Sequence, residues 1–145
     1  MAHFLVVEDF PPMATLLATA LRREGHTVSR AGSIANALSI NESFDHAVLD
    51  VDLPDGNGVE LATTLLSEHR VDSIVFFTAS RDVQMLTKAL RLGLVVDKAA
   101  GYDCLMSAVR QLASTGIAGR VAVAGSSETL TIHTTGRSGT RRKIE

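Results

Sequence analysis

Hydrophobic positions along this chain form short apolar runs, and stretches with helical periodicity separate them. Strands are predicted at about residues 4–7, 27–30, 45–50, 73–78 and 94–97. Continuous apolar runs of this length, set between helices, are typical of parallel strands that are buried on both faces. Strand and helix alternate five times. The pattern therefore predicts an α/β fold with a doubly wound, five-stranded parallel sheet and right-handed crossovers.

Turn and capping residues mark the ends of the first three helical stretches. Pro11 opens the first helix and Gly25 ends it, since Pro suits a helix start and Gly a helix end. Ser33 is predicted to cap a second helix that runs to about residue 42. Asn57 is predicted to cap a third helix, which runs to about residue 69.

The last two helices are expected on either side of the fifth strand. Ser80 is the predicted cap of the fourth helix, and Gly93 is its predicted stop. Apolar residues at positions i, i+3, i+4, i+7 and i+8 predict the buried stripe of the fifth helix, namely Leu105, Ala108, Val109, Leu112 and Ala113.

Polar residues with matching chemistry stand at the ends of four of these strands. Glu8 and Asp9 follow the first strand, Asp50 closes the third, Thr78 closes the fourth, and Lys98 stands just beyond the fifth. In an open α/β sheet, ligands bind at the carboxyl ends of the strands, so we expect these side chains to converge on one rim. Three carboxylates, a hydroxyl and an ammonium suit a divalent cation and a phosphoryl group.

Charge and composition divide the chain into two parts. Residues 1–115 carry 9 basic and 14 acidic side chains, whereas residues 116–145 carry 5 basic and 2 acidic ones and are rich in Gly, Ser and Thr. We expect one domain at 1–115 and a poorly ordered basic tail at 116–145. The alternation at Leu130 and Ile132, after the apolar run 121–123, leaves open a weak hairpin or a strand added to a partner.

The expected location is the cytoplasm. The chain enters its first strand at once, without a basic segment and a long apolar stretch of the kind that forms a signal peptide, and no apolar run approaches the length of a membrane span. Its single cysteine, Cys104, suits a reducing compartment. We therefore expect no membrane association.

The segment Val48-Leu49-Asp50-Val51-Asp52-Leu53-Pro54-Asp55-Gly56-Asn57-Gly58 carries a resemblance to a known family. An Asp closes an apolar strand, and a Pro stands four residues on, in a Gly-rich loop. Together with the other strand-end residues, this segment resembles the receiver domain of bacterial two-component response regulators, of the chemotaxis-regulator kind. The resemblance covers about residues 3–115 and implies a flavodoxin-like sheet with strand order 2-1-3-4-5 and five helices.

The resemblance and the chemistry of the side chains suggest a role for each residue. Asp50 is the expected phosphoacceptor, since a carboxylate can form an aspartyl-phosphate. The Thr78 hydroxyl would be the switch group, and the Lys98 ammonium would pair with a phosphoryl oxygen. Mg²⁺ is the expected cofactor, and its implied ligands are Glu8, Asp9, Asp50 and the backbone carbonyl of Asp52.

A phosphoacceptor of this family would take its phosphoryl group from a histidine kinase or a histidine phosphotransfer protein. It would not be a turnover enzyme, because it only gains and loses a phosphoryl group. By resemblance, a downstream protein or a second copy of the chain would bind the face of the fourth helix, fifth strand and fifth helix. DNA is not an expected partner, since residues 116–145 show no helix-turn-helix pattern and the three charges at 141–143 give only weak, salt-sensitive binding.

The fifth strand departs from the family pattern. Val95 stands where many receivers have the aromatic residue that follows the switch hydroxyl, and Ala99 and Ala100 stand where a proline is common. A valine cannot swing a ring in or out, so switching would have to use backbone or fourth-helix shifts.

Two other functions compete with a phosphoacceptor. The departures at the fifth strand would suit a pseudo-receiver, which binds a partner protein without phosphorylation. A metal-dependent phosphohydrolase can also use an aspartyl-phosphate, and Asp52 has the spacing of its acid/base carboxylate. Residues 1–115 leave no room for the cap that would close over a substrate, which argues against the hydrolase.

Overall fold

A seven-stranded sheet forms the centre of the molecule in the computed structural model, which describes residues 1–115, 120–124 and 129–133, with side chains described for residues 1–113. The strand order is β2-β1-β3-β6-β7-β8-β9. The strands are β1 (His3–Val7), β2 (Thr27–Ala31), β3 (His46–Leu49), β6 (Ser73–Thr78), β7 (Leu94–Asp97), β8 (Arg120–Ala124) and β9 (Thr129–His133).

Five strands of this sheet confirm the fold class that the sequence predicts. Strands β2, β1, β3, β6 and β7 run parallel, and they give the order 2-1-3-4-5 when they are counted along the chain. The register places Leu5 beside Ala47 and Ala47 beside Ile74, so the apolar runs lie level with one another. A separate two-stranded ribbon pairs β4 (Asp52–Leu53) with β5 (Gly56–Asn57) in the loop after β3.

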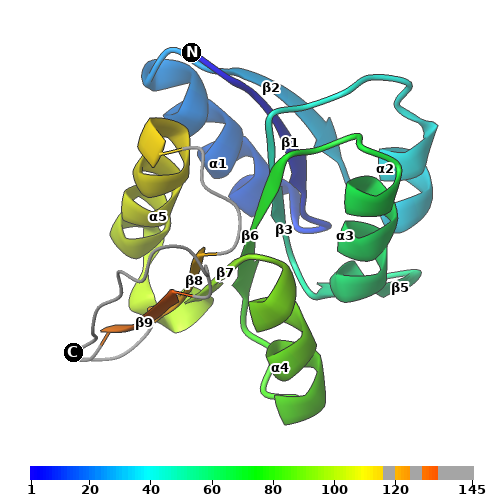
Figure 1. Cartoon of the computed structure of the whole chain (residues 1–145). Helices are drawn as coiled ribbons and strands as arrows, with labels where there is room; N and C mark the ends of the chain where they lie inside the picture. Colours follow the sequence, from blue (N-terminus) through cyan, green and yellow to red (C-terminus); the bar gives the residue numbers. More distant parts are fainter. Residues whose placement is uncertain (116–119, 125–128, 134–145) are drawn as a thin grey trace.

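Five helices cover the two faces of the sheet (Figure 1). They are α1 (Pro11–Arg23), α2 (Ile34–Ser39), α3 (Gly58–Ser67), α4 (Val83–Leu92) and α5 (Tyr102–Thr115). Helices α1 and α5 pack on one face, and α2, α3 and α4 pack on the other. A short 3₁₀ helix, η1 (Lys98–Ala100), links β7 to α5. Within the described residues, no helix is long and apolar enough to cross a membrane.

Alternate residues of each strand face opposite layers, which explains the continuous apolar runs. Phe4 and Val6 pack in the layer of α1 and α5, while Leu5 and Val7 pack in the layer of α2, α3 and α4. All four are at most 1% exposed. Because both faces of a parallel sheet are covered, neither face of the strand can be polar.

Helix α2 ends earlier than the sequence predicts. Ser33 caps it as expected, because its hydroxyl accepts from the backbone N–H of Asn36 at 3.1 Å. The helix stops at Ser39 rather than at residue 42, and Ile40 is extended. The Arg70 guanidinium donates to the carbonyls of Leu38 and Ile40, so a side chain from the loop after α3 replaces further helical hydrogen bonds.

Two predictions for the last helices are wrong in detail. Helix α4 is capped by Asp82, whose carboxylate accepts from the backbone N–H groups of Gln84 and Met85, and not by Ser80. On α5, Ala113 is exposed and Met106 is buried in its place. Gly93 ends α4 as predicted.

The segment after α5 forms the hairpin that the alternation at Leu130 and Ile132 left open. Strand β8 pairs with β7 in parallel, and β9 returns antiparallel to β8. Residues 116–119, 125–128 and 134–145 lie outside the described residues, so the expectation of a poorly ordered tail stays a prediction for them.

Candidate functional site

The carboxyl ends of four neighbouring strands bring the predicted site residues together. Glu8 and Asp9 follow β1, and Asp50 follows β3, which is paired with β1 up to its last residue. Thr78 is the last residue of β6, and its partner in the register, Asp97, directly precedes Lys98. The sheet register itself therefore places a hydroxyl, an ammonium and three carboxylates at one rim.

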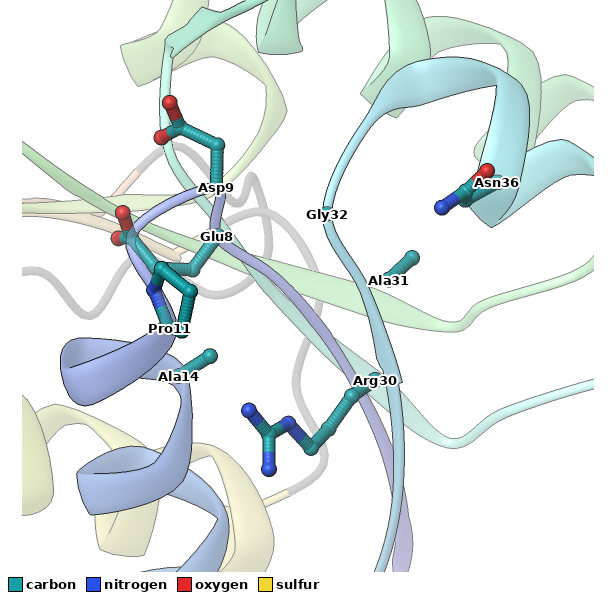
Figure 2. Close-up of a pocket in the computed structure, with 8 residues that line it drawn as sticks. All are labelled: Glu8, Asp9, Pro11, Ala14, Arg30, Ala31, Gly32 and Asn36. Carbon is teal, nitrogen blue, oxygen red and sulfur yellow. The ribbon is translucent and has the colours of Figure 1, made fainter.

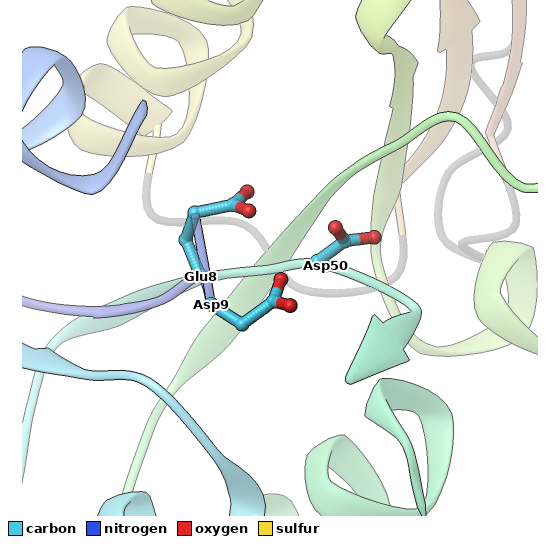
Figure 3. Close-up of side chains that lie close together, drawn as sticks. All are labelled: Glu8, Asp9 and Asp50. Carbon is cyan, nitrogen blue, oxygen red and sulfur yellow. The ribbon is translucent and has the colours of Figure 1, made fainter. Parts of the chain in front are cut away.

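Three carboxylates form a compact acidic cluster at this rim. Glu8, Asp9 and Asp50 each offer one oxygen, and these oxygens lie within 4.8 Å of one another (Figure 3). Glu8 is 4% exposed and Asp50 is 6% exposed, whereas Asp9 lies open to solvent. The cluster is thus half enclosed, with its open side at Asp9.

Lys98 bridges the two buried carboxylates. Its Nζ lies 2.8 Å from Asp50 Oδ2 and 3.0 Å from Glu8 Oε1. Burial alone would lower the pKa of Lys98, but the hydrogen bonds and charges of Asp50 and Glu8 outweigh burial, and the pKa is raised. The ammonium therefore stays charged, and one positive charge faces three carboxylates.

At Glu8, unlike at Lys98, the effect of burial on the pKa is larger than the effect of the neighbouring charges. Burial raises the pKa of the Glu8 carboxyl, and this effect exceeds the lowering by the hydrogen bond and charge of Lys98 and by the backbone N–H of Phe10. The nearby Asp50 carboxylate raises it further. A further positive charge beside Glu8 would favour the ionised form of its carboxyl.

Thr78 already contacts Asp50 in this structure. Its hydroxyl donates to Asp50 Oδ1 at 2.8 Å and accepts from the backbone N–H of Ser80 at 3.1 Å. Thr78 is 1% exposed, so these bonds are shielded from bulk solvent. Ser80, which the sequence suggested as a helix cap, instead orients the Thr78 hydroxyl.

Close packing and hydrogen bonds to the backbone hold the loop after Asp50 in place. The backbone N–H of Asp52 donates to Asp50 Oδ1 at 3.1 Å. Gly58 lies so close that a Cβ there would stand 2.0 Å from the Asp50 carbonyl oxygen. The Asp55 carboxylate accepts from the N–H groups of Ile34 and Ala35, which lowers the pKa of Asp55 and ties this loop to α2.

An ion pair that sequence reasoning missed joins the segment before α4 to the end of β7. Arg81 Nη1 lies 2.9 Å from Asp97 Oδ2. The backbone N–H of Ala99 and then Arg81 lower the pKa of Asp97. The two residues stand 16 positions apart with no motif around them, so only the pairing of β6 with β7 brings them together.

A pocket of about 260 Å³ also lies beside the acid pair, and no motif in the sequence indicates it. Its walls come from the end of β1, the start of α1, the end of β2 and α2 (Figure 2). In Figure 2, the carboxylates of Glu8 and Asp9 turn away from Gly32 and Asn36 across the pocket, and the Arg30 side chain extends toward Ala14 of α1. Asp50, Thr78 and Lys98 do not line it, so it adjoins the site without containing it.

The acidic cluster fits a hard divalent cation. Carboxylate oxygens are the ligands that Mg²⁺ prefers, and the ion commonly takes one or two of them with water and phosphate oxygens. Three carboxylates and one ammonium leave a formal charge of −2 at the rim, and a divalent ion would balance it. Glu8, Asp9 and Asp50 are the side chains placed to hold it.

Comparison with known proteins agrees with this geometry. A family model described as the response regulator receiver domain matches residues 4–110. The transcriptional regulatory protein DpiA of Escherichia coli K12 is 34% identical over 94 residues, which cover 62% of this chain and 42% of DpiA. The transcriptional regulatory protein TcrA of Mycobacterium tuberculosis is 36% identical over 103 residues, covering 70% of this chain and 36% of TcrA. The chain thus matches less than half the length of these two relatives.

Solved structures show the same fold. The response regulator TrrA from Thermotoga maritima, solved in complex with Mg²⁺-BeF, matches with a TM-score of 0.68 and 26% identity, over 77% of this chain and 99% of TrrA. A CheY-like receiver domain protein from Methanospirillum hungatei matches with a TM-score of 0.70 and 22% identity, over 77% of this chain and 92% of that protein.

Proposed function

The chain belongs to the response regulator receiver domain family, and we propose that it is a phosphoacceptor whose phosphoryl group is carried by Asp50. The observation that carries this proposal is the way Asp50 is held. Its Oδ1 accepts from the Thr78 hydroxyl, and its Oδ2 accepts from the Lys98 ammonium, beside two further carboxylates. The proposed nucleophile, two donors that could bind phosphoryl oxygens and the proposed cation ligands thus lie close together, which supports the proposal.

The reaction is a phosphoryl transfer to the Asp50 carboxylate. An Asp50 oxygen forms the new O–P bond while the bond between phosphorus and the donor breaks, and the leaving group takes up a proton. Such transfers depend mainly on positioning and on neutralising the charge of the phosphoryl oxygens. Bound Mg²⁺ would supply part of that neutralisation. Lys98 and Thr78 supply the rest, because each can pass its hydrogen bond from Asp50 to an oxygen of the incoming group.

Family membership supports a histidine kinase or a histidine phosphotransfer protein as the donor and the cytoplasm as the location. Receiver domains are in general phosphoacceptors and not turnover enzymes, and we propose the same for this chain. The proposed output is a changed protein-binding surface on α4, β7 and α5. We place Mg²⁺ on Glu8, Asp9, Asp50 and the backbone carbonyl of Asp52.

A test of this proposal is the intact mass of the protein after incubation with acetyl phosphate. We expect one phosphoryl adduct that needs Mg²⁺ and is absent from Asp50→Asn. We expect Lys98→Ala to slow adduct formation, whereas Lys88→Ala, which alters an exposed lysine on α4, leaves it unchanged. A protein that binds Mg²⁺ but never forms the adduct would be a pseudo-receiver, and the proposal would be wrong.

A further inference from the structure

Asp97, the last residue of β7, uses both of its carboxylate oxygens beside the site. Oδ1 accepts from the backbone N–H of Ala99 at 2.8 Å, and Oδ2 lies 2.9 Å from Arg81 Nη1. The first contact caps η1, the short 3₁₀ helix that begins at Lys98. The second contact joins the end of β7 to the segment before α4. Asp97 is not one of the residues to which the proposed function gives a role, so these contacts need an explanation of their own.

Lys98 is the residue that the capping bond encloses. The acceptor, Asp97, directly precedes it in the chain, and the donor, Ala99, directly follows it. At the far end of its side chain, Lys98 Nζ lies 2.8 Å from Asp50 Oδ2 and 3.0 Å from Glu8 Oε1. A lysine ammonium stands on a flexible four-carbon stem. The backbone turn at Lys98 therefore decides whether the ammonium reaches both carboxylates.

The alanine at position 99 supplies a donor that a proline would lack. Ala99 is one of the two alanines that stand where a proline is common. A proline has no N–H to donate to Asp97, and it disfavours helical dihedral angles in the residue before it. Lys98 has such a conformation as the first residue of η1. The departure from the family pattern and the capping bond of Asp97 thus belong to the same turn.

Arg81 holds the Asp97 carboxylate from the other side. The turn that carries Arg81 is fixed to the end of β6, because the Ser80 N–H donates to Thr78 Oγ1. Thr78 is also the register partner of Asp97. Arg81 and Asp97 are therefore placed by neighbouring strands, and their ion pair orients the carboxylate that caps η1.

From these contacts we infer that Asp97 is a positioning residue for the phosphorylation of Asp50, because its cap and its pairing with Arg81 hold the Lys98 ammonium against Asp50 and Glu8. The inference rests on the proposed function, in which Lys98 binds an oxygen of the incoming phosphoryl group. A donor that is already in place needs no reorganisation during the reaction. A misplacement of about 1 Å can slow a reaction about a hundredfold. Asp97 itself touches no reacting atom and acts through Lys98.

Acylation of lysines in the full chain tests the position of Lys98 without any phosphorylation. Acetic anhydride acylates only the neutral amine, and contact with two carboxylates favours the ammonium form. Peptide mass spectrometry compares the labelling rate of Lys98 with that of Lys88, which is exposed on α4. We expect Asp97→Ala to raise the relative rate of Lys98 several-fold. Asp97→Asn should raise it less, because its amide oxygen still accepts from Ala99. An unchanged rate in Asp97→Ala would overturn the inference.

Arg110→Gln is the matched control for the ion pair. Arg110 Nη2 lies 2.6 Å from Glu24 Oε2, and the two side chains are 60% and 29% exposed, whereas those of Arg81 and Asp97 are 68% and 23% exposed. We expect Arg81→Gln to raise the labelling of Lys98 by less than Asp97→Ala does, and Arg110→Gln to leave it unchanged. An equal rise in the Arg81 and Arg110 variants would reflect a general loss of stability and would overturn the role of the pair.

Phosphorylation by acetyl phosphate separates positioning from damage to the site. At saturating Mg²⁺, Asp97→Ala should be phosphorylated at least about fivefold more slowly than the wild type, within the range that a misplaced group can cause. Its Kd for Mg²⁺ should not rise, because Lys98 is a cation and not a metal ligand. A Mg²⁺ affinity that falls together with the rate would show that the acidic cluster itself is disturbed, which would contradict an action through Lys98.

The proposed function and this inference fail in different ways. If the wild type binds Mg²⁺ but gains no phosphoryl group, the phosphoacceptor is wrong, and with it the role of Asp97 in phosphorylation. If the wild type is phosphorylated and Asp97→Ala reacts at the same rate, the phosphoacceptor stands and the positioning role is wrong.

Discussion

Asp50 is held by three donors before any ligand arrives. The Thr78 hydroxyl and the Asp52 N–H donate to Oδ1, and the Lys98 ammonium donates to Oδ2. These contacts fix the carboxylate and reduce the reorganisation that phosphoryl transfer would need. Asp9 is different, because it is exposed and no ion pair within the described residues involves it. Asp9 therefore adds negative charge to the cluster without compensation, which makes it the most informative residue for a test of cation binding.

The first prediction concerns Asp9→Asn. Removal of one uncompensated charge should stabilise the metal-free protein slightly, by about 0.5 kcal/mol, the scale of exposed charge interactions. The wild type should gain about 2.7 kcal/mol at a Mg²⁺ concentration 100 times its Kd, and Asp9→Asn should gain much less. Thermal unfolding with and without Mg²⁺ measures both effects. Asp103→Asn, an exposed carboxylate on α5, is the control, and an equal Mg²⁺ response in Asp9→Asn would contradict the cation site.

The second prediction concerns Gly58, which the sequence presents only as part of a Gly-rich loop. A methyl group there would stand 2.0 Å from the Asp50 carbonyl oxygen, so the backbone that carries Asp50 must move. We expect Gly58→Ala to lower the free energy of unfolding by about 1–3 kcal/mol, as overpacking does, and to slow phosphorylation. Gly32→Ala is the matched control, because a Cβ at Gly32 meets nothing within 4 Å. Denaturant unfolding that shows equal losses for both variants would contradict this packing.

At the scale of elements, helix ends depend on contacts that the local sequence does not reveal. Ser33 and Asn57 cap α2 and α3 as the sequence predicts, since each accepts from the N–H three residues on. Ser80 is not the cap of α4, because its hydroxyl accepts from the N–H of Asp82 and the helix begins only after Asp82. The Ser80 N–H donates to Thr78 Oγ1, so Ser80 belongs to the turn that joins Thr78 to the helix.

The third prediction tests the corrected cap of α4. The Asp82 carboxylate accepts from the N–H groups of Gln84 and Met85 at 3.0 and 3.2 Å. Asp82→Ala should cost about 1 kcal/mol, the usual value of a cap, and should speed hydrogen exchange at these two amides. Asp82→Asn should keep most of the protection, because an amide oxygen also accepts. Exchange at Gln84 and Met85 that responds to Ser80→Ala but not to Asp82→Ala would restore Ser80 as the cap.

The molecule as a whole is polarised, with the acidic rim at the carboxyl ends of the strands and a buried histidine at the opposite end. His46, the first residue of β3, is 7% exposed, and its Nδ1 lies 2.7 Å from Ser73 Oγ. Burial lowers its pKa, and the positive form of His26 lowers it further, while Asp45 and Asp72 raise it without reversing the direction. The folded protein therefore favours the neutral form of His46.

The fourth prediction follows from that depressed pKa. Between the ordinary histidine pKa of 6.5 and the lower folded value, the unfolded chain binds more protons at this position than the folded protein does. Stability should therefore fall as pH drops below 6.5 and level off below the folded pKa. His46→Gln keeps a hydrogen-bonding group for Ser73 without titrating. The melting temperature of this variant should fall less than that of the wild type between pH 7 and pH 5, and an identical fall would contradict the role of His46.

Sequence patterns predicted the five parallel strands and the convergence of the site residues because both follow from strand alternation and from strand ends. The early end of α2 could not be predicted, since it depends on Arg70 reaching back to the carbonyls of Leu38 and Ile40. The pairing of Arg81 with Asp97 likewise follows only from the register of β6 and β7. The site roles themselves stay proposals, because geometry places the groups together without showing a reaction.

The position of the phosphoryl group on the protein decides whether Asp50 is the phosphoacceptor. After incubation with acetyl phosphate and Mg²⁺, borohydride reduces an aspartyl-phosphate to homoserine, and peptide mass spectrometry then locates the reduced residue. We expect homoserine at position 50 and at no other aspartate. Reduction at Asp9 or Asp52, or at no aspartate despite bound Mg²⁺, would contradict Asp50 as the phosphoacceptor.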